Sequence, residues 1–373
     1  MGNEPAVLIV ALSGRALAAS ARRGGYAPLV ADMFGDLDTL DVACRHVRLA
    51  GGLAPGIEEQ HLVDALQMLS KDQEPIGVVY GTGFEDRPQL LHRMAECWRL
   101  FGNNADVVAK LKDPKIFSSI CSSSDIPSPE ISLPEPAIAN GWLAKRQGGA
   151  GGAHIKPADD SADARGAVYY QRSVSGTPIS ACFLADGERA HLLGFSAQWS
   201  SQIARQPYRY GGAVRPAPLA PDMADKLTAA VQRIVAATSL VGLNSADFIV
   251  EGERFWLLEI NPRPGATLDI FETGGTSLFA QHLTACSGKL AATSGYAANA
   301  KAAGIVYAEQ DIASFSISDW PDWAADLPIA GSAIKAGDPV CTVYACDLAA
   351  AGARALVEER RKAVLSWACA RNS

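Results

Sequence analysis

The order of apolar and polar positions predicts, in the N-terminal part of the chain, short buried strands that alternate with helices. The apolar runs of strand length lie at residues 6–11, 27–31, 44–49 and 76–80. A helical pattern covers residues 57–69. Alternation of this kind is typical of a parallel α/β sheet, in which ligands gather at the carboxyl ends of the strands.

Two loops follow such strand ends, Ser13-Gly14-Arg15 and the stretch from Gly81 to Glu85. In the second loop, Gly83 would allow a ligand to approach the backbone closely, and Glu85 is placed to receive an amine. A plain glycine turn with a surface glutamate is the alternative, because a single Gly-x-Gly is weak evidence for nucleotide binding.

Two helical patterns come next, over residues 87–101 and 107–124, with a boundary at Gly102-Asn103-Asn104 between them. The second pattern carries Lys112 and Lys115. Prolines cannot continue a helix, so the proline-rich stretch that begins at Pro127 ends this one.

A strand at residues 142–146 then carries Lys145 into a loop rich in glycine, with Gly148, Gly149, Gly151 and Gly152. Such a loop can present bare backbone N–H groups to phosphate oxygens. It is not a P-loop, because no Gly-Lys-Ser/Thr follows. A surface loop without function is the alternative, but the strand lysine just before the loop favours phosphate binding.

Further strands are predicted at residues 168–174, and a hairpin at 179–185 and 191–195. The following stretch is polar and cationic, and its Arg209 and Arg215 are candidates to bind an anionic substrate. An ordinary loop is the alternative. A convincing amphipathic helix covers residues 221–238.

The most informative stretch is a predicted hairpin from Asp247 to Asn261, with its turn at Glu-Gly-Glu. Glu259 and Asn261 are two residues apart, so on an extended backbone they point to the same face. With Asp247 on the paired strand, these hard oxygen groups suit Mg²⁺. Arg263 could hold a phosphoryl group or a carboxylate. The alternative is a hairpin that ends in a structural Asn-Pro turn.

The C-terminal part changes in composition after the small-residue linker 291–303, and we expect a small β domain there. Its strands are predicted at residues 305–307, 314–317, 331–334 and 340–345, with a terminal helix at 348–367. Cys341 lies in this part, and a buried structural thiol is favoured over a thiol at the site.

Composition narrows the class of protein. The chain has 373 residues, a net charge of −7, 48% hydrophobic residues and 20% charged residues, which fits a globular protein with more than one domain. The acidic balance argues against nucleic acid as a partner. No long apolar stretch predicts a membrane span. The eight cysteines form no C-x-x-C pair, so reduced thiols and a cytoplasmic location are expected.

With these pieces in order, the chain resembles the ATP-grasp superfamily, and most of all its carboligase-like branch related to biotin carboxylase. Tyramine–glutamate ligases of methanofuran synthesis are similar. The resemblance is good from about Tyr80 to Glu272. Its most specific part is Asp247-Phe248 together with Leu258 to Pro264, and the pair of Lys145 with the glycine loop comes second.

The resemblance implies an ATP-grasp fold, with an N-terminal parallel α/β domain, two α+β lobes and a small C-terminal β-rich domain. The expected bounds are 1–104 for the N-terminal domain, 105–174 for the lid lobe, 175–300 for the metal-site lobe and 301–373 for the C-terminal domain.

It also implies roles for individual residues. Lys115, chosen over Lys112, and Lys145 would bind ATP, and the glycine loop would cover the phosphates. Arg263 would steady the acyl-phosphate step. The strand at Gln171, Arg172 and Val174 would border adenine, and Asp247, Glu259 and Asn261 would bind magnesium.

The implied function is ATP-dependent ligation of a small-molecule carboxylate to an amine through an acyl phosphate, with release of ADP and phosphate. A glutamate-type substrate and a role in one-carbon cofactor synthesis follow from the similar ligases alone. A bicarbonate-using carboxylase and a non-catalytic nucleotide-binding protein are the alternatives. The sequence does not define the oligomeric state, although a homodimer is common among such proteins.

Overall fold

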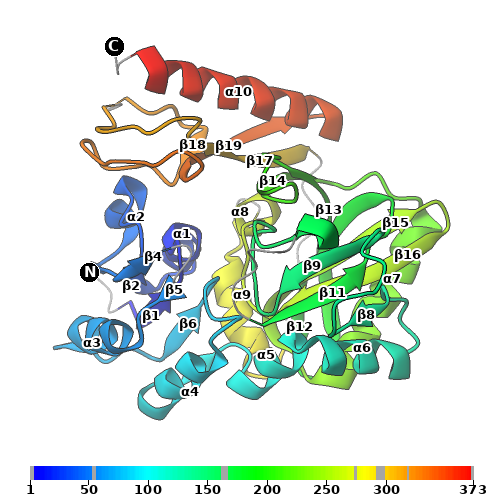
Figure 1. Ribbon diagram of the computed structural model, residues 1–373. Coiled ribbons are helices and arrows are strands. Elements are labelled where there is room, and N and C mark those ends of the chain that lie inside the picture. The colour runs from blue at the N-terminus through cyan, green and yellow to red at the C-terminus, as the bar shows by residue number, and fades with distance from the viewer. Residues whose placement is uncertain are drawn as a thin grey trace.

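The structure is a computed structural model, which describes residues 4–52, 56–160, 167–272, 275–290, 299–316 and 319–370, without the side chains of 368–370. Its N-terminal part, blue and cyan in Figure 1, contains a five-stranded parallel sheet in the order β3-β2-β1-β6-β7. The elements are β1 (Ala6–Val10), α1 (Arg15–Arg23), β2 (Ala27–Asp32), α2 (Leu37–Val42), β3 (Arg45–Arg48), β4 (Gly51–Gly52), β5 (Gly56–Ile57), α3 (Glu59–Ser70), β6 (Val78–Tyr80), α4 (Pro88–Cys97) and β7 (Leu100–Phe101). The predicted parallel α/β sheet is confirmed.

The predicted helix over residues 87–101 is wrong at its C-terminal end. Helix α4 stops at Cys97, and Leu100–Phe101 form the edge strand β7, which pairs with β6. Pairing with the sheet overrides the helical pattern, and Gly102 follows with a φ of +151°, which a helix does not allow.

The single helical pattern over residues 107–124 is wrong as one helix. The structure has two, α5 (Ala105–Lys112) and α6 (Pro114–Ser123). Asp113 between them is extended, and its Oδ1 accepts a hydrogen bond from the Ile116 amide at 2.9 Å. A residue before proline is driven out of the helical region, and proline suits the first position of a new helix, so Asp113-Pro114 restarts the chain in a new direction.

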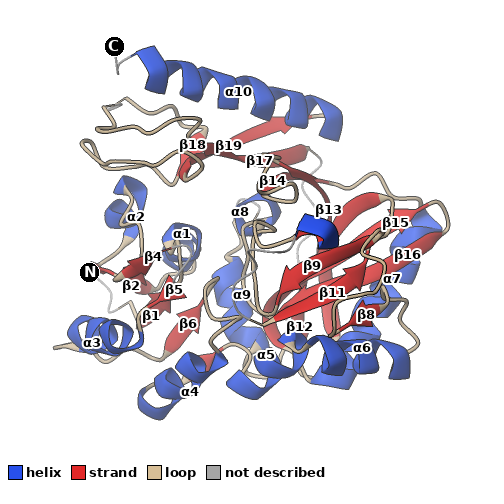
Figure 2. Ribbon diagram, in the orientation of Figure 1, coloured by secondary structure: helices blue, strands red, loops and turns tan. Residues whose placement is uncertain are grey.

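Two antiparallel sheets follow, as the strands in Figure 2 show. The smaller has the order β10-β9-β11-β8, from β8 (Ile131–Ser132), β9 (Trp142–Arg146), β10 (Lys156–Pro157) and β11 (Val168–Arg172), with a short 3₁₀ turn at Ala158–Asp160. The larger has eight strands in the order β16-β15-β12-β13-β14-β17-β19-β18. Its first five are β12 (Thr177–Asp186), β13 (Ala190–Ser200), β14 (Tyr210–Arg215), β15 (Val241–Glu251) and β16 (Arg254–Asn261).

The C-terminal strands do not form a sheet of their own. Strands β17 (Ala300–Tyr307), β18 (Ala324–Ala325) and β19 (Pro339–Asp347) extend the eight-stranded sheet through β14, and α10 (Ala350–Ala370) packs on β17 and β19 (Figure 1). The predicted strand at 331–334 is wrong, since only an isolated bridge joins Ile312 to Ile334. Residues 317 and 291–298, within the predicted strand 314–317 and the predicted linker, lie outside the described residues.

Helices and shared cores join these parts. Helix α7 (Pro221–Thr238) packs with α5 and α6 against one face of the large sheet, so α5 and α6 share their core with that sheet. Helices α8 (Leu268–Phe271) and α9 (Leu278–Ala285) lie between the large sheet and the N-terminal part. Val7 and Ile9 of β1 belong to the same apolar cluster as Leu184 of β12, so the parallel sheet and the large sheet are packed into one body. No helix in the described part of the chain is long and apolar enough to cross a bilayer.

Candidate active site

The predicted metal ligands come together on the hairpin β15–β16. Asp247 lies directly opposite Glu259 in the strand register, and Asn261 follows on the same strand. Asn261 Nδ2 donates to Asp247 Oδ2 at 2.9 Å. The alternation of strand side chains therefore puts both carboxylates and the amide on one face, as the sequence predicts.

Two further side chains hold Asp247 in place. Ser180 of β12 lies opposite Asp247 in the sheet, and its hydroxyl donates to Asp247 Oδ1 at 2.6 Å. Gln198 Nε2 on β13 lies 3.4 Å from the same oxygen. Sequence reasoning missed both, because it did not predict that β12 pairs with β15, and its strand 191–195 ended before Gln198.

The cation nearest these groups is Lys112, at the end of α5. Its Nζ lies 3.4 Å from Glu259 Oε2 and 3.3 Å from Asn261 Oδ1, and the residue is buried. Lys115, expected to bind ATP, is exposed on α6 and lies beside Glu130 and Ile131. The structure therefore brings Lys112, and not Lys115, to the carboxylates.

The environment of the hairpin shifts the pKa values of its two carboxyl groups in opposite directions. Burial alone would raise the pKa of Glu259, but the positive charges of Lys112 and Lys145 outweigh it and lower that pKa to about 2. Burial, and next the charge of Glu259, raise the pKa of Asp247 to about 6. Burial also lowers the pKa of Lys145, which Glu259 opposes. Negative charge is thus concentrated on Glu259, where a cation would meet it.

These donors fit Mg²⁺, which prefers carboxylate and amide oxygens and takes its remaining ligands from water and phosphate. The Glu259 side chain is 37% exposed, and the Lys112 ammonium already lies between it and Asn261, so this position suits a cation. Within the described residues no group of three or more His, Cys, Asp or Glu side chains could hold a metal. A metal at this hairpin would have two carboxylates and one amide as protein ligands, and water or phosphate could supply the others.

The glycine loop beyond Lys145 makes close contacts that only glycine allows. Gly148 has a φ of +69°, and a Cβ there would lie 2.5 Å from Asp86 Cα. Gly152 has a φ of +74°, and a Cβ there would lie 2.0 Å from the carbonyl oxygen of Tyr208. The loop is therefore seated against two separate segments, with Gly149 and Gly151 between these contacts.

Gln171 and Arg172, which are expected to border adenine, face opposite ways. Gln171 on β11 is buried, whereas the Arg172 side chain is half exposed and its guanidinium lies 4.7 Å from the centre of the Trp142 ring. Arg172 therefore points away from the interior, and Val174 follows beyond the end of the strand. The alternation of β11 leaves Gln171 as the inward side chain.

Arg263 and Glu85 form a buried ion pair. Arg263 Nε donates to Glu85 Oε1 at 2.7 Å, and Arg263 Nη2 lies 3.5 Å from Asn261 Oδ1. Glu85 Oε2 accepts from the amides of Gly83 and Phe84 at 2.9 and 3.0 Å. The expected amine acceptor thus already binds three protein donors, and it holds Arg263 beside Asn261, one of the predicted metal ligands.

The two arginines expected to bind an anionic substrate are both engaged within the protein. Arg209 lies 3.8 Å over the Tyr307 ring and donates to the carbonyls of Ser201 and Gly337 at 3.0 and 3.1 Å. Arg215 donates to the carbonyl of Ile270. Of the two, Arg209 lines a large cavity and Arg215 does not.

That cavity measures about 1080 Å³, enough for a nucleotide and a small substrate. Lys145, Glu85, the glycine loop and His154 line it, as do Arg15 and Asp36 of the N-terminal domain. Burial is the largest effect that lowers the pKa of His154, to about 4, so this ring is neutral at pH 7. Sequence reasoning missed His154, although it lies just beyond the glycine loop.

Comparison with known proteins identifies one domain. Residues 117–267 match the profile of the ATP-grasp domain, which includes Lys145, the glycine loop and the whole β15–β16 hairpin. No curated protein sequence matches the chain.

Solved structures of the same fold cover most of the chain. Biotin carboxylase from Campylobacter jejuni, solved as a β-γ-ATP complex, is 14% identical with a TM-score of 0.70, over 91% of this chain and 87% of its own. The biotin carboxylase domain of Hydrogenobacter thermophilus 2-oxoglutarate carboxylase, solved with MgADP and bicarbonate, is 13% identical with a TM-score of 0.70, over 90% and 85%. N5-carboxyaminoimidazole ribonucleotide synthetase from Thermotoga maritima is 14% identical with a TM-score of 0.69, over 96% and 98%. At these identities the likeness establishes the fold.

Proposed function

We propose, from the premise that this chain has the ATP-grasp fold and contains an ATP-grasp domain, that it is an ATP-dependent carboxylate–amine ligase. It would form an amide through an acyl phosphate and release ADP and phosphate. The observation that carries the proposal is the meeting of Asp247, Glu259 and Asn261 with Lys112 and Arg263. Arg263 is in turn bound to Glu85, which lines the large cavity.

Different residues would serve different steps of such a reaction. Lys145 and the backbone amides of the glycine loop would bind phosphate oxygens, and a closed loop would keep water from the acyl phosphate. Arg263, fixed by Glu85, would hold the transferring phosphoryl group or the substrate carboxylate. Gln171 and the backbone near Val174 would border adenine.

Asp247, Glu259 and Asn261 would hold Mg²⁺, which when bound neutralises charge on the nucleotide phosphates. Lys112 would have to leave the Glu259 carboxylate when the metal enters, and it is long enough to turn toward phosphate. On this proposal, Lys112 takes the part first assigned to Lys115.

A hydroxylamine trap tests the function without knowledge of the amine. Purified protein receives ATP, magnesium, hydroxylamine and pools of small carboxylic acids, with glutamate first because similar ligases use it. We expect hydroxamate and ADP in equal amounts with one acid. ADP that appears only with bicarbonate would replace the proposal with carboxylase chemistry. Absence of ADP with every acid, in protein that binds ATP, would refute catalysis of this type.

A further inference from the structure

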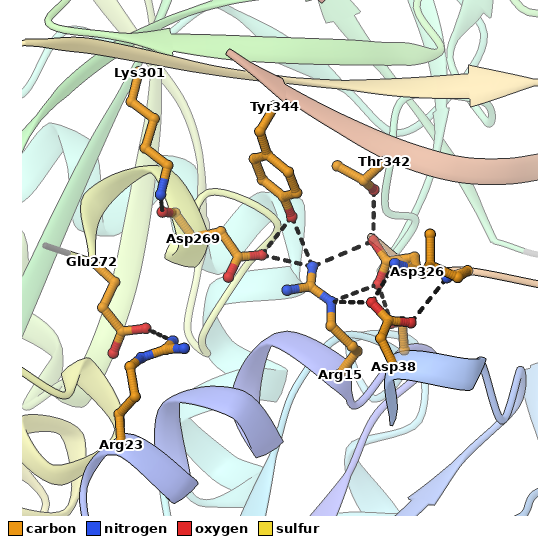
Figure 3. A network of polar contacts seen from close by, with 11 residues as sticks. Arg15, Arg23, Asp38, Asp269, Glu272, Lys301, Asp326, Thr342 and Tyr344 are labelled. Atoms are coloured by element: carbon orange, nitrogen blue, oxygen red, sulfur yellow. Dashed lines mark hydrogen bonds and ion pairs between the residues drawn. The ribbon is translucent and has the colours of Figure 1, made fainter. Parts of the chain in front are cut away.

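A second cluster of charged side chains lines the cavity, separate from the metal-ligand residues. Arg15, at the start of α1, lies at its centre (Figure 3). Its Nη2 donates to Asp269 Oδ2 at 2.6 Å and to the Tyr344 hydroxyl at 2.7 Å, and its Nε donates to Asp326 Oδ1 at 3.1 Å. One arginine thus joins the N-terminal domain to the segments after β16 and before β19.

The acidic side of the cluster exceeds this positive charge. Asp326 also accepts a hydrogen bond from Thr342 at 2.6 Å, and Asp38 lies 3.7 Å from the Arg15 Nε (Figure 3). Asp38 accepts from the amides of Asp326 and Leu327 at 2.8 and 2.9 Å. Arg15 thus forms ion pairs with Asp38, Asp269 and Asp326, and it forms none with a further carboxyl group of the described residues.

That further carboxyl group is Asp36. The residue is only 7% exposed and it lines the cavity. Its side chain has no hydrogen bond or ion pair with any residue in the described ranges. The nearby Asp32 differs, because it accepts from the amides of Gly14 and Gly35 and from His46. Buried carboxyl groups are normally paired, so an unpaired one that faces a cavity needs a partner from outside.

We propose that Asp36 binds the ammonium group of the amine substrate, with the negative charge of Asp326 nearby. The inference rests on the proposed ligase function, and it moves the amine site from Glu85, whose oxygens bind Arg263 and two amides, to the N-terminal and C-terminal walls of the cavity. A substrate anion would find a net excess of carboxylates here, and the Nε and Nη2 of Arg15 are already bound.

The charges around Asp36 support this choice of ligand. Burial, and then the charges of Asp326, Asp32 and Asp38, raise its pKa to about 8, and Arg15 lowers it only in part. The Cys341 thiol also faces the cluster, and its pKa is raised well above the ordinary value by burial. The raised pKa favours the protonated form of Asp36 near neutral pH, and an ammonium that binds there would displace that proton.

Isothermal titration calorimetry tests the site directly. The probes are n-butylamine and phenethylamine, with n-butanol and phenethyl alcohol as neutral analogues, and the protein is the full chain with ADP and magnesium. We expect the amines to bind, the alcohols not to bind, and Asp36→Asn to weaken amine binding by about tenfold or more, as for loss of one charged hydrogen bond. Asp41→Asn, an exposed aspartate on the same helix α2, should bind like the wild type.

The experiment is repeated in two buffers that differ in ionisation enthalpy and carry no amine. Proton release should make the observed heat depend on the buffer in the wild type, and this readout carries the test if Asp36→Asn does not fold. Equal amine affinity in Asp36→Asn and wild type, or no binding of either amine, would overturn the inference. Amine binding does not require turnover, so the two proposals can fail separately. If the hydroxylamine trap gives no product, but the wild type binds the amines and Asp36→Asn does not, the ligase function is refuted and the amine site stands.

Discussion

Replacement of Glu85 by glutamine tests the ion pair that places Arg263. The two side chains are only 9% and 3% exposed, and their atoms are 2.7 Å apart. Glutamine keeps the shape but has one acceptor oxygen, so its NH₂ group must face either Arg263 or the amides of Gly83 and Phe84, which are all donors. The change therefore leaves a buried guanidinium without its counter-charge.

Loss of one partner of a buried ion pair typically destabilises a protein by about 3–5 kcal/mol. We expect Glu85→Gln to lie near the lower end, about 3 kcal/mol, because no cavity forms. Burial alone would raise the pKa of Glu85, but Arg263 and Lys112 lower it. A lowered folded pKa stabilises the fold above the unfolded pKa of about 4.3, and this stabilisation is lost as the pH falls through the folded value. The difference from wild type should be full at pH 7 and shrink below about pH 4.

Urea unfolding at several pH values measures this difference. The control is Glu96→Gln, which removes an exposed ion pair with Arg93 and should change stability by less than about 1 kcal/mol. In Glu85→Gln with Arg263→Met, the unpaired charge is gone, so stability should return in part while ligase turnover stays lost. If Glu85→Gln were no less stable than Glu96→Gln at pH 7, Glu85 could not be the counter-charge of Arg263.

Three further predictions concern the nucleotide side of the site. Glu259→Gln should lower kcat about a hundredfold or more with an unchanged circular dichroism spectrum, and retained turnover would remove the hairpin from the mechanism. Lys112→Met should raise the pKa of Glu259 above about 2 in carboxyl NMR titrations, whereas Lys115→Met should leave it unchanged; the reverse would restore the first assignment. Gly152→Ala should weaken ATP binding more than Gly151→Ala, because a Cβ at 152 meets a backbone oxygen at 2.0 Å and one at 151 meets nothing within 4 Å; equal affinities, measured calorimetrically, would contradict this.

The parts of the site that sequence could predict are those contained in one element. Asp247, Glu259 and Asn261 share a hairpin, so strand periodicity alone puts them on one face. The glycine loop was also predictable as a phosphate-binding candidate, because its glycines lie close together in the sequence. The choice of Lys112 over Lys115 was only partly predictable. Asp113-Pro114 is a local signal for the start of a new helix, and this break determines which lysine faces the hairpin.

The remaining contacts depend on how distant segments pack, and no local pattern contains them. Glu85 and Arg263 are separated by 178 residues, and each alone resembles a free binding group. Arg15 and Asp326 are separated by 311 residues, and they meet only because β17, β18 and β19 extend the large sheet over the N-terminal domain. A charged residue that looks available in the sequence can thus be one half of such a pair, as Glu85 and Arg263 are. The unpaired Asp36 stands out because the structure accounts for its charged neighbours, and for this reason the amine site could be inferred only after the fold was known.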